Sequence, residues 1–125
     1  MQEINAGHVI LLRVVIEYID RYGEPPSARQ VFQHETGHGL YATFLEENKI
    51  GSIVAKPIPG NSFLTNMVRE LRDAGLFDSG KSQMIPTPAG RRLTDTFQPE
   101  DNRPFSIRVD RHGSFDPEAV QLPLG

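Results

Sequence analysis

Residues 62–93 constrain the fold of this chain more than any other stretch, because they hold the signals for a helix, for its end and for the elements after it. Leu64, Val68 and Leu71 recur at helical spacing, which predicts an amphipathic helix with one apolar face. Gly75 can adopt the left-handed conformation that ends a helix, since it has no Cβ. The stretch therefore predicts a helix with a defined C-terminal end.

The segment after this helix predicts a short hairpin and then a second helix. The apolar pairs at 76–77 and 84–85 flank residues 78–82, Asp-Ser-Gly-Lys-Ser, a turn-forming stretch. Thr87 followed by Pro88 is typical of a helix start, because the hydroxyl accepts a free backbone amide and proline has no amide to satisfy.

This order of elements resembles the second half of a winged-helix domain, as found in winged helix-turn-helix transcription regulators. The phrase Glu-Leu-Arg-Asp-Ala-Gly-Leu-Phe at 70–77 is similar to the end of their recognition helix, and Ile-Pro-Thr-Pro-Ala-Gly-Arg-Arg-Leu at 85–93 to the return from their wing. Gly-Glu-Pro-Pro-Ser at 23–27, after a long helix, is similar to their front half. The resemblance implies a mostly α fold with a small β-hairpin wing, and a regulator of transcription that binds double-stranded DNA.

The front of the chain predicts two helices. The first runs over about residues 7–22, and Ser27 with Gln30 forms a capping box that begins the second. The apolar arc of the first helix is wide, and large apolar patches are rare on the surfaces of monomers. We therefore expect a homodimer through residues 9–22.

An insert at about 37–60 separates this chain from a compact winged helix, in which only a short turn precedes the recognition helix. Within it, residues 40–48 predict an extra helix and residues 50–55 predict a short strand. The insert leaves open a second interpretation, in which the winged helix is an adaptor that binds proteins of the transcription or replication machinery.

We expect one winged-helix domain over residues 1–97 and a C-terminal extension over 98–125 that is partly extended or flexible. Apolar and polar residues alternate over 105–109, which predicts a strand. The final Gln-Leu-Pro-Leu-Gly at 121–125 is similar to the short peptides that bacterial replication proteins insert into the sliding clamp, although it lacks their terminal aromatic residue. This tail is a candidate binding segment for a protein partner.

Composition excludes several classes of site. The chain has 125 residues and no cysteine, so a disulfide framework, a thiolate nucleophile and a cysteine zinc site are excluded. The start has no basic region typical of a signal peptide, and the longest apolar run is too short to cross a bilayer. We expect a cytoplasmic protein with no membrane contact.

Charge is distributed unevenly along the chain. Residues 49–92 hold seven basic and three acidic side chains, a net charge of +4, whereas the whole chain has 13 basic and 16 acidic residues. The remainder therefore carries −7, and the positive part coincides with the resemblance to a DNA-binding module.

The helix and wing of the winged-helix interpretation define candidate contacts to DNA. Hydroxyl and amide side chains can contact phosphates or base edges, an arginine can bind a guanine edge with two hydrogen bonds, and a lysine can bind phosphate. The candidates are Ser62, Thr65, Asn66 and Arg69 on the helix, Lys81 at the wing tip, and Arg91 and Arg92 on the last helix.

A histidine pair offers a different chemistry. His34, Glu35 and His38 match His-Glu-x-x-His, which on a helix places two imidazoles on one face as zinc ligands, with the glutamate as general base. Glycines at 37 and 39 weaken a helix there, and no third histidine follows at the spacing of the metzincins. A minimal zinc peptidase stays the second alternative on the strength of this motif. In the main interpretation we expect no catalytic residue and no cofactor. His8 has no partner pattern and is expected to be a surface or capping residue.

Overall fold

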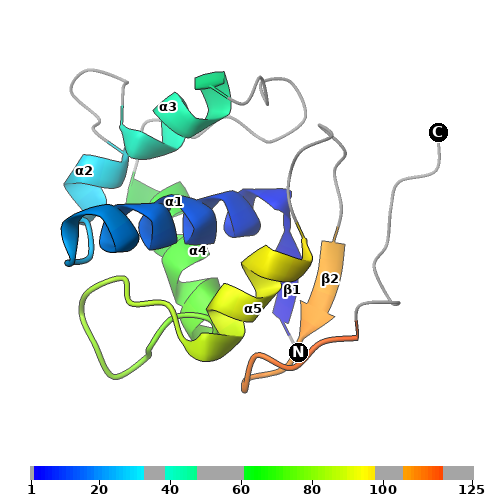
Figure 1. The fold of residues 1–125 in the computed structure, drawn as a ribbon. Helices are drawn as coiled ribbons and strands as arrows, with labels where there is room; N and C mark the ends of the chain where they lie inside the picture. The colour runs from blue at the N-terminus through cyan, green and yellow to red at the C-terminus, as the bar shows by residue number, and fades with distance from the viewer. Residues whose placement is uncertain (1, 33–38, 48–60, 98–105, 117–125) are drawn as a thin grey trace, which may run out of the picture.

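The computed structural model describes residues 2–32, 39–47, 61–97 and 106–116. In these ranges the chain is mostly helical with one small antiparallel sheet, which confirms the broad fold class (Figure 1). The elements in chain order are β1 (Gln2–Asn5), α1 (Ala6–Tyr22), α2 (Ala28–Phe32), α3 (Leu40–Glu47), α4 (Asn61–Asp73), α5 (Pro88–Thr96) and β2 (Ser106–Val109).

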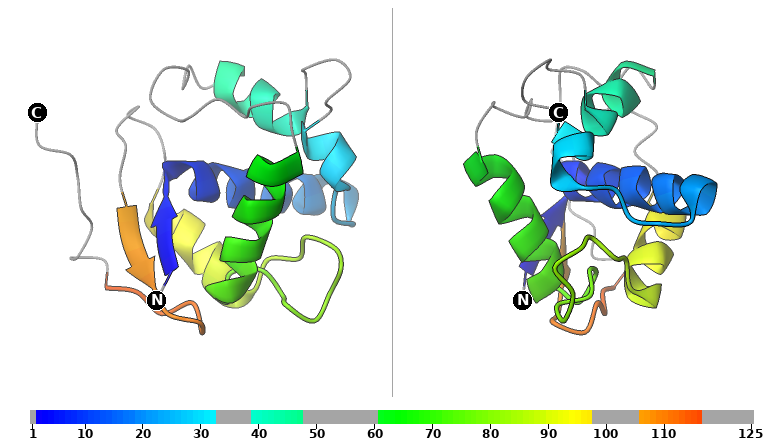
Figure 2. Two further views of the ribbon diagram at one scale, coloured as in Figure 1. Left: turned by 180° about the vertical axis from the view of Figure 1, so that it is seen from behind. Right: turned by 90° about the vertical axis from the view of Figure 1, so that its left-hand side faces the viewer.

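Helix α1 is the centre of the core. Val9, Ile10, Leu11 and Leu12 are four consecutive residues that point in every direction around the helix, and all four are fully buried. Helices α3 and α5 lie on opposite sides of α1 in both figures of the fold, while α4 packs beside β1 (Figures 1 and 2). Burial of one such side chain stabilises a fold by about 1.5–3 kcal/mol, so α1 anchors the domain.

The apolar arc of α1 is therefore largely covered within one chain. Residues 9–12, 14 and 15 are all buried, and the exposed large apolar side chain of the described residues is Tyr22, at 59% exposure. The homodimer surface predicted over 9–22 is thereby reduced to the last turns of the helix, where it stays a prediction.

The sheet joins the two ends of the described chain. Strand β1 pairs with β2 in antiparallel register, with Ile4 opposite Ile107 and Glu3 opposite Arg108. The isoleucine pair is buried and the charged pair is exposed, so one face of the sheet belongs to the core and the other to solvent. Residues 106–116 of the predicted C-terminal extension thus pack on the predicted 1–97 domain.

The predicted hairpin is present as an isolated bridge between Phe77 and Pro86, not as a pair of strands. The Asp78 amide donates to the Ile85 carbonyl at 2.8 Å, and the Thr87 amide donates to the Leu76 carbonyl at 3.0 Å. The ladder ends there because the amides that would continue it are used elsewhere: the Ile85 amide donates to the Gln83 carbonyl and the Leu76 amide donates to the Leu71 carbonyl. The sheet of this structure is therefore not the wing that the sequence predicts, and the winged helix stays a proposal.

The ends of the other helices follow their local signals. Gly75 has a φ of 68°, and it donates to Arg72 while Leu76 donates to Leu71, the hydrogen-bond pattern of a Schellman end. Thr87 caps α5, whose first residue is Pro88, as predicted.

The capping box of α2 is also present as predicted. Ser27 Oγ accepts from the Gln30 amide at 3.1 Å, and Gln30 Oε1 accepts from the Ser27 amide at 2.8 Å. The extra helix predicted over 40–48 is found as α3. The predicted strand at 50–55 and the tail at 121–125 lie outside the described residues. Within the described part of the chain, no helix combines the length and the apolar character needed to cross a bilayer.

Candidate functional site

Helix α4 carries most of the residues that the sequence identifies as DNA contacts. Its buried side includes Met67 and Leu71, four residues apart, and Ala74 directly after the helix is buried as well. Asn66 and Arg69 are exposed, and within the described ranges the side chain of neither forms a hydrogen bond or an ion pair. Asn66 and Arg69 therefore present an amide and a guanidinium to solvent.

The orientation of α4 differs slightly from the predicted one. The predicted stripe runs through Val68, which is only partly buried, whereas Met67 takes the buried position beside Leu71. A methionine fills irregular gaps in a core, so its burial has no distinctive sequence signal. Ser62 and Thr65 fall within the bounds of α4, but their side chains lie outside the described residues.

The loop after α4 is fastened to that helix by Arg72. One Nη2 hydrogen donates to the carbonyl of Ser82 at 2.9 Å, across ten residues of sequence. Lys81, the neighbour of Ser82, is exposed, and its side-chain ammonium has no partner in the described part of the chain. Asp78 stiffens the same loop by accepting the Gly80 amide at 2.9 Å. The loop thus holds a cation near the C-terminal half of α4.

The two arginines on α5 have different surroundings. Arg91 forms an ion pair with Asp20 of α1, with 3.3 Å between Nη1 and Oδ1, while Arg92 is exposed. Figure 2 shows α4 and α5 on different sides of the molecule, with the loop between them. The structure therefore places Asn66 and Arg69 on one helix and the arginine pair on another.

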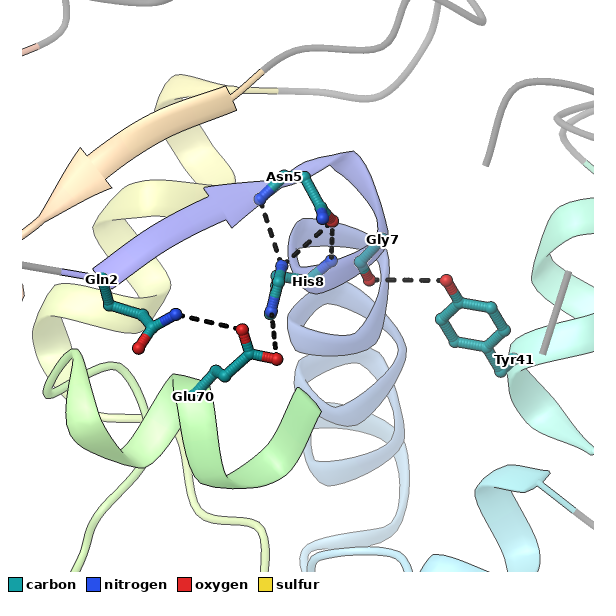
Figure 3. A network of polar contacts seen from close by, with 6 residues as sticks. All are labelled: Gln2, Asn5, Gly7, His8, Tyr41 and Glu70. Atoms are coloured by element: carbon teal, nitrogen blue, oxygen red, sulfur yellow. Dashed lines mark hydrogen bonds and ion pairs between the residues drawn. The ribbon is translucent and has the colours of Figure 1, made fainter. Parts of the chain in front are cut away.

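A polar network lies on the inner side of α4, where it meets β1 and α1 (Figure 3). Glu70 Oε2 accepts from Gln2 Nε2 at 3.0 Å, and Glu70 Oε1 lies 3.6 Å from His8 Nε2. The Asn5 amide donates to His8 Nδ1 at 3.1 Å, and Asn5 Oδ1 accepts from the His8 amide at 3.3 Å. His8 is thus a capping residue, one of the two roles that the sequence leaves open, in the third position of α1.

Burial makes His8 more than a cap. The residue is 3% exposed, and this desolvation lowers the pKa of its imidazole below 6.5, while the neighbouring carboxylate of Glu70 acts in the opposite direction. His8 is therefore neutral near pH 7. The contact between His8 and Glu70 could not be predicted from the sequence, because 62 residues separate the two and no spacing pattern relates them.

The described residues contain no cluster of three or more histidine, aspartate or glutamate side chains close enough to hold a metal ion. The His34-Glu35-x-x-His38 motif lies outside those residues, so the peptidase alternative stays a sequence hypothesis. Comparison of the chain with models of protein families, with curated proteins and with solved structures gives no match.

Proposed function

We propose that this protein binds double-stranded DNA through the exposed side of α4 and the loop at 78–85, and that it regulates transcription by occupying its site. The observation that supports this most is the hydrogen bond from Arg72 to Ser82, which holds the Lys81 loop against the helix that exposes Asn66 and Arg69. A free guanidinium, a free amide and a free ammonium therefore belong to one connected unit.

Each of these groups has a defined role on a duplex. A helix fits the major groove, where Arg69 can bind a guanine edge or a phosphate and Asn66 can bind an adenine edge with two hydrogen bonds. Lys81, on a loop beside the helix, suits a phosphate contact. Arg91 is already paired with Asp20 and lies on α5, so the unit around α4 carries the main contacts in this proposal.

The experiment begins with selection of bound duplexes from a random pool and continues with binding isotherms for Arg69→Ala, Lys81→Ala and the control Arg92→Ala. The control removes the same charge from α5. We expect Arg69→Ala to weaken binding by about 5- to 150-fold, equivalent to about 1–3 kcal/mol. Lys81→Ala should lower the slope of log affinity against log salt by about 1.

The control decides between a specific surface and a general charge effect. Arg92→Ala should weaken binding less than either of the other variants. Full affinity in Arg69→Ala, or equal losses in all three variants, would remove α4 from the mechanism.

The adaptor function is the second candidate, and the end of α1 favours it. Tyr22 is 59% exposed, its ring centroid lies 4.6 Å from that of Tyr18, and the Arg21 guanidinium lies 5.5 Å from the centre of the Tyr22 ring. Exposed aromatic and arginine side chains are enriched at protein interfaces. Sedimentation of wild type and Tyr22→Ser over a range of concentrations tests self-association through this end of α1, and a monomer at all concentrations excludes the homodimer.

A further inference from the structure

We propose that Glu70 is a positioning residue, whose carboxylate fixes the rotation of α4 and thereby determines which side chains this helix presents to DNA. The partners of the carboxylate are Gln2 of β1 and His8 of α1. Glu70 itself does not contact DNA in this proposal and acts through Asn66 and Arg69. The consequence for a duplex rests on the proposed function, whereas the contacts of Glu70 can be tested without DNA.

Four consecutive residues of α4 face different surroundings. Leu71 is fully buried, and Glu70 and Arg72 lie about 100° around the helix to either side of it. Glu70 reaches β1 and α1, whereas Arg72 reaches the loop at 78–85. Arg69 lies in the remaining sector and is exposed. The two flanking charges therefore hold α4 from two sides, and a rotation of the helix would break at least one of their contacts.

The contact of Glu70 with β1 is a hydrogen bond between two side chains. Gln2 Nε2 donates to Glu70 Oε2 at 3.0 Å (Figure 3). Strand β1 is itself fixed, because it pairs with β2 and its Ile4 is fully buried. The side chain of Glu70 is 29% exposed, so water and salt screen this bond less than they screen a bond on the open surface.

The contact of Glu70 with α1 comes from the His8 ring. The backbone amide of Asn5 is always a donor, so His8 Nδ1, 3.1 Å away, is the acceptor. In the neutral ring the hydrogen then lies on Nε2, which faces Glu70 Oε1 at 3.6 Å (Figure 3). Nε2 has no hydrogen-bond partner within the described residues, so its electrostatic contact with the carboxylate offsets the cost of burying this N–H group.

A positioning role and a simple charge effect of Glu70 predict opposite changes in DNA binding. A carboxylate that only repels phosphates weakens binding, so its removal should strengthen binding to every duplex. Removal of a carboxylate that holds α4 should instead weaken binding to the selected duplex, because base edges are read only when Asn66 and Arg69 are aligned with them. Binding to a random duplex depends mainly on charge and should not weaken.

Binding isotherms for Glu70→Ala, Glu70→Gln and the control Asp73→Ala separate these roles. The two variants of Glu70 remove the same charge, but glutamine can still accept from His8 and can donate to Gln2 once the Gln2 amide turns over. Asp73 ends the same helix and is exposed, and its side chain has no partner in the part of the chain that the structure describes. Alanine is the best helix former, so a loss in Glu70→Ala does not come from helix propensity.

We expect Glu70→Ala to weaken binding to the selected duplex by about 5-fold or more, the effect of losing one base contact, and to leave binding to a random duplex at least as tight as in wild type. Glu70→Gln and Asp73→Ala should bind the selected duplex at least as tightly as wild type. Equal affinities in the two variants of Glu70, whether raised or lowered, overturn the proposal, because these variants differ in hydrogen bonding and not in charge.

A second experiment on the free protein keeps the proposal testable should no duplex bind. NMR of the His8 ring should give ¹⁵N shifts typical of the Nε2–H tautomer. Amide exchange protection of α4, relative to that of α5, should fall by about 5-fold or more in Glu70→Ala, the effect of about one hydrogen bond, and stay unchanged in Asp73→Ala. An Nδ1–H tautomer, or equal protection of α4 in the two alanine variants, overturns the proposal. Absence of DNA binding with both NMR results as expected refutes the proposed function alone.

Discussion

Gly75 provides the sharpest test of how the C-terminal residues pack on the rest of the molecule. It ends α4 with a φ of 68°, and Gly23 ends α1 with a φ of 79°, so both glycines adopt the left-handed conformation. A Cβ at Gly75 would lie 2.5 Å from the Arg111 carbonyl oxygen and 3.0 Å from the Gly113 amide nitrogen. A Cβ at Gly23 would have nothing within 4 Å. The two sites therefore share a backbone conformation and differ only in their neighbours.

The expected magnitudes come from this comparison. The left-handed conformation costs an alanine about 1–2 kcal/mol, and the loss of glycine freedom in the unfolded chain offsets about 0.4–1 kcal/mol of that. Gly23→Ala should therefore destabilise the fold by about 1 kcal/mol or less. Gly75→Ala carries the same term plus about 1–3 kcal/mol, because the rigid backbone at residues 111–113 must move.

Urea denaturation of both variants beside wild type measures the difference, provided that the m-values agree. The amide spectrum should change around residues 110–114 in Gly75→Ala and stay unchanged there in Gly23→Ala. Equal free energies of unfolding would show that the turn at 110–114 does not lie against the end of α4. In that case the packing of residues 106–116 on the domain would need to be revised.

Three further predictions concern local contacts. Thr87→Ala removes both the cap on the Gly90 amide and a 2.6 Å hydrogen bond from Thr87 to the Gly75 carbonyl, so it should destabilise the fold by about 1–3 kcal/mol. The control Thr96→Ala, on the exposed end of α5, should cost less than about 0.5 kcal/mol. Thermal unfolding of both variants measures the difference. Arg72→Ala should leave the fold intact and increase the susceptibility of the loop at 78–85 to limited proteolysis, and cleavage at the wild-type rate would contradict this. Hydrogen bonds from the backbone amides of Ser114 and His112 hold the pKa of Asp110 below its usual value. The contribution of the Asp110 carboxylate to stability should therefore be present above about pH 4 and be lost as acid protonates the carboxylate. An NMR titration that gives this carboxyl group an ordinary pKa would contradict the prediction.

Local signals account for the parts of the fold that the sequence predicts well. The end of α4 depends on one glycine, the start of α5 on a threonine followed by a proline, and the start of α2 on a serine and a glutamine three residues apart. Each signal satisfies backbone groups of its own helix, so it acts without help from distant residues. Helix α1 is also predicted from the sequence, because its apolar residues are numerous enough to indicate a buried helix.

The sheet could not be predicted in the same way. Residues 2–5 contain one apolar side chain, Ile4, and become a strand because residues 106–109 supply the partner. The alternation at 105–109 does predict a strand, but a strand pattern does not name its partner, which here lies at the opposite end of the described chain. Local turn signals favour a hairpin at 76–86, but it has one bridge because the Ile85 and Leu76 amides donate within their own segments, to Gln83 and Leu71.

The candidate site shows most clearly where sequence reasoning ends. Arg69 and Arg72 contribute equally to the positive charge of the 49–92 segment, yet they lie three residues apart on one helix and do different things. Arg69 is exposed without a partner in the described ranges, whereas Arg72 has a buried Nε and donates to the loop. Glu70, between them, would be counted as a charge that weakens a DNA-binding face, but Gln2 and His8 hold its carboxylate toward the interior. A count of charges therefore gives the correct net charge of the segment but assigns the wrong role to Glu70 and Arg72. Only the packing of α4 against β1 and α1 decides which of these charges a partner meets.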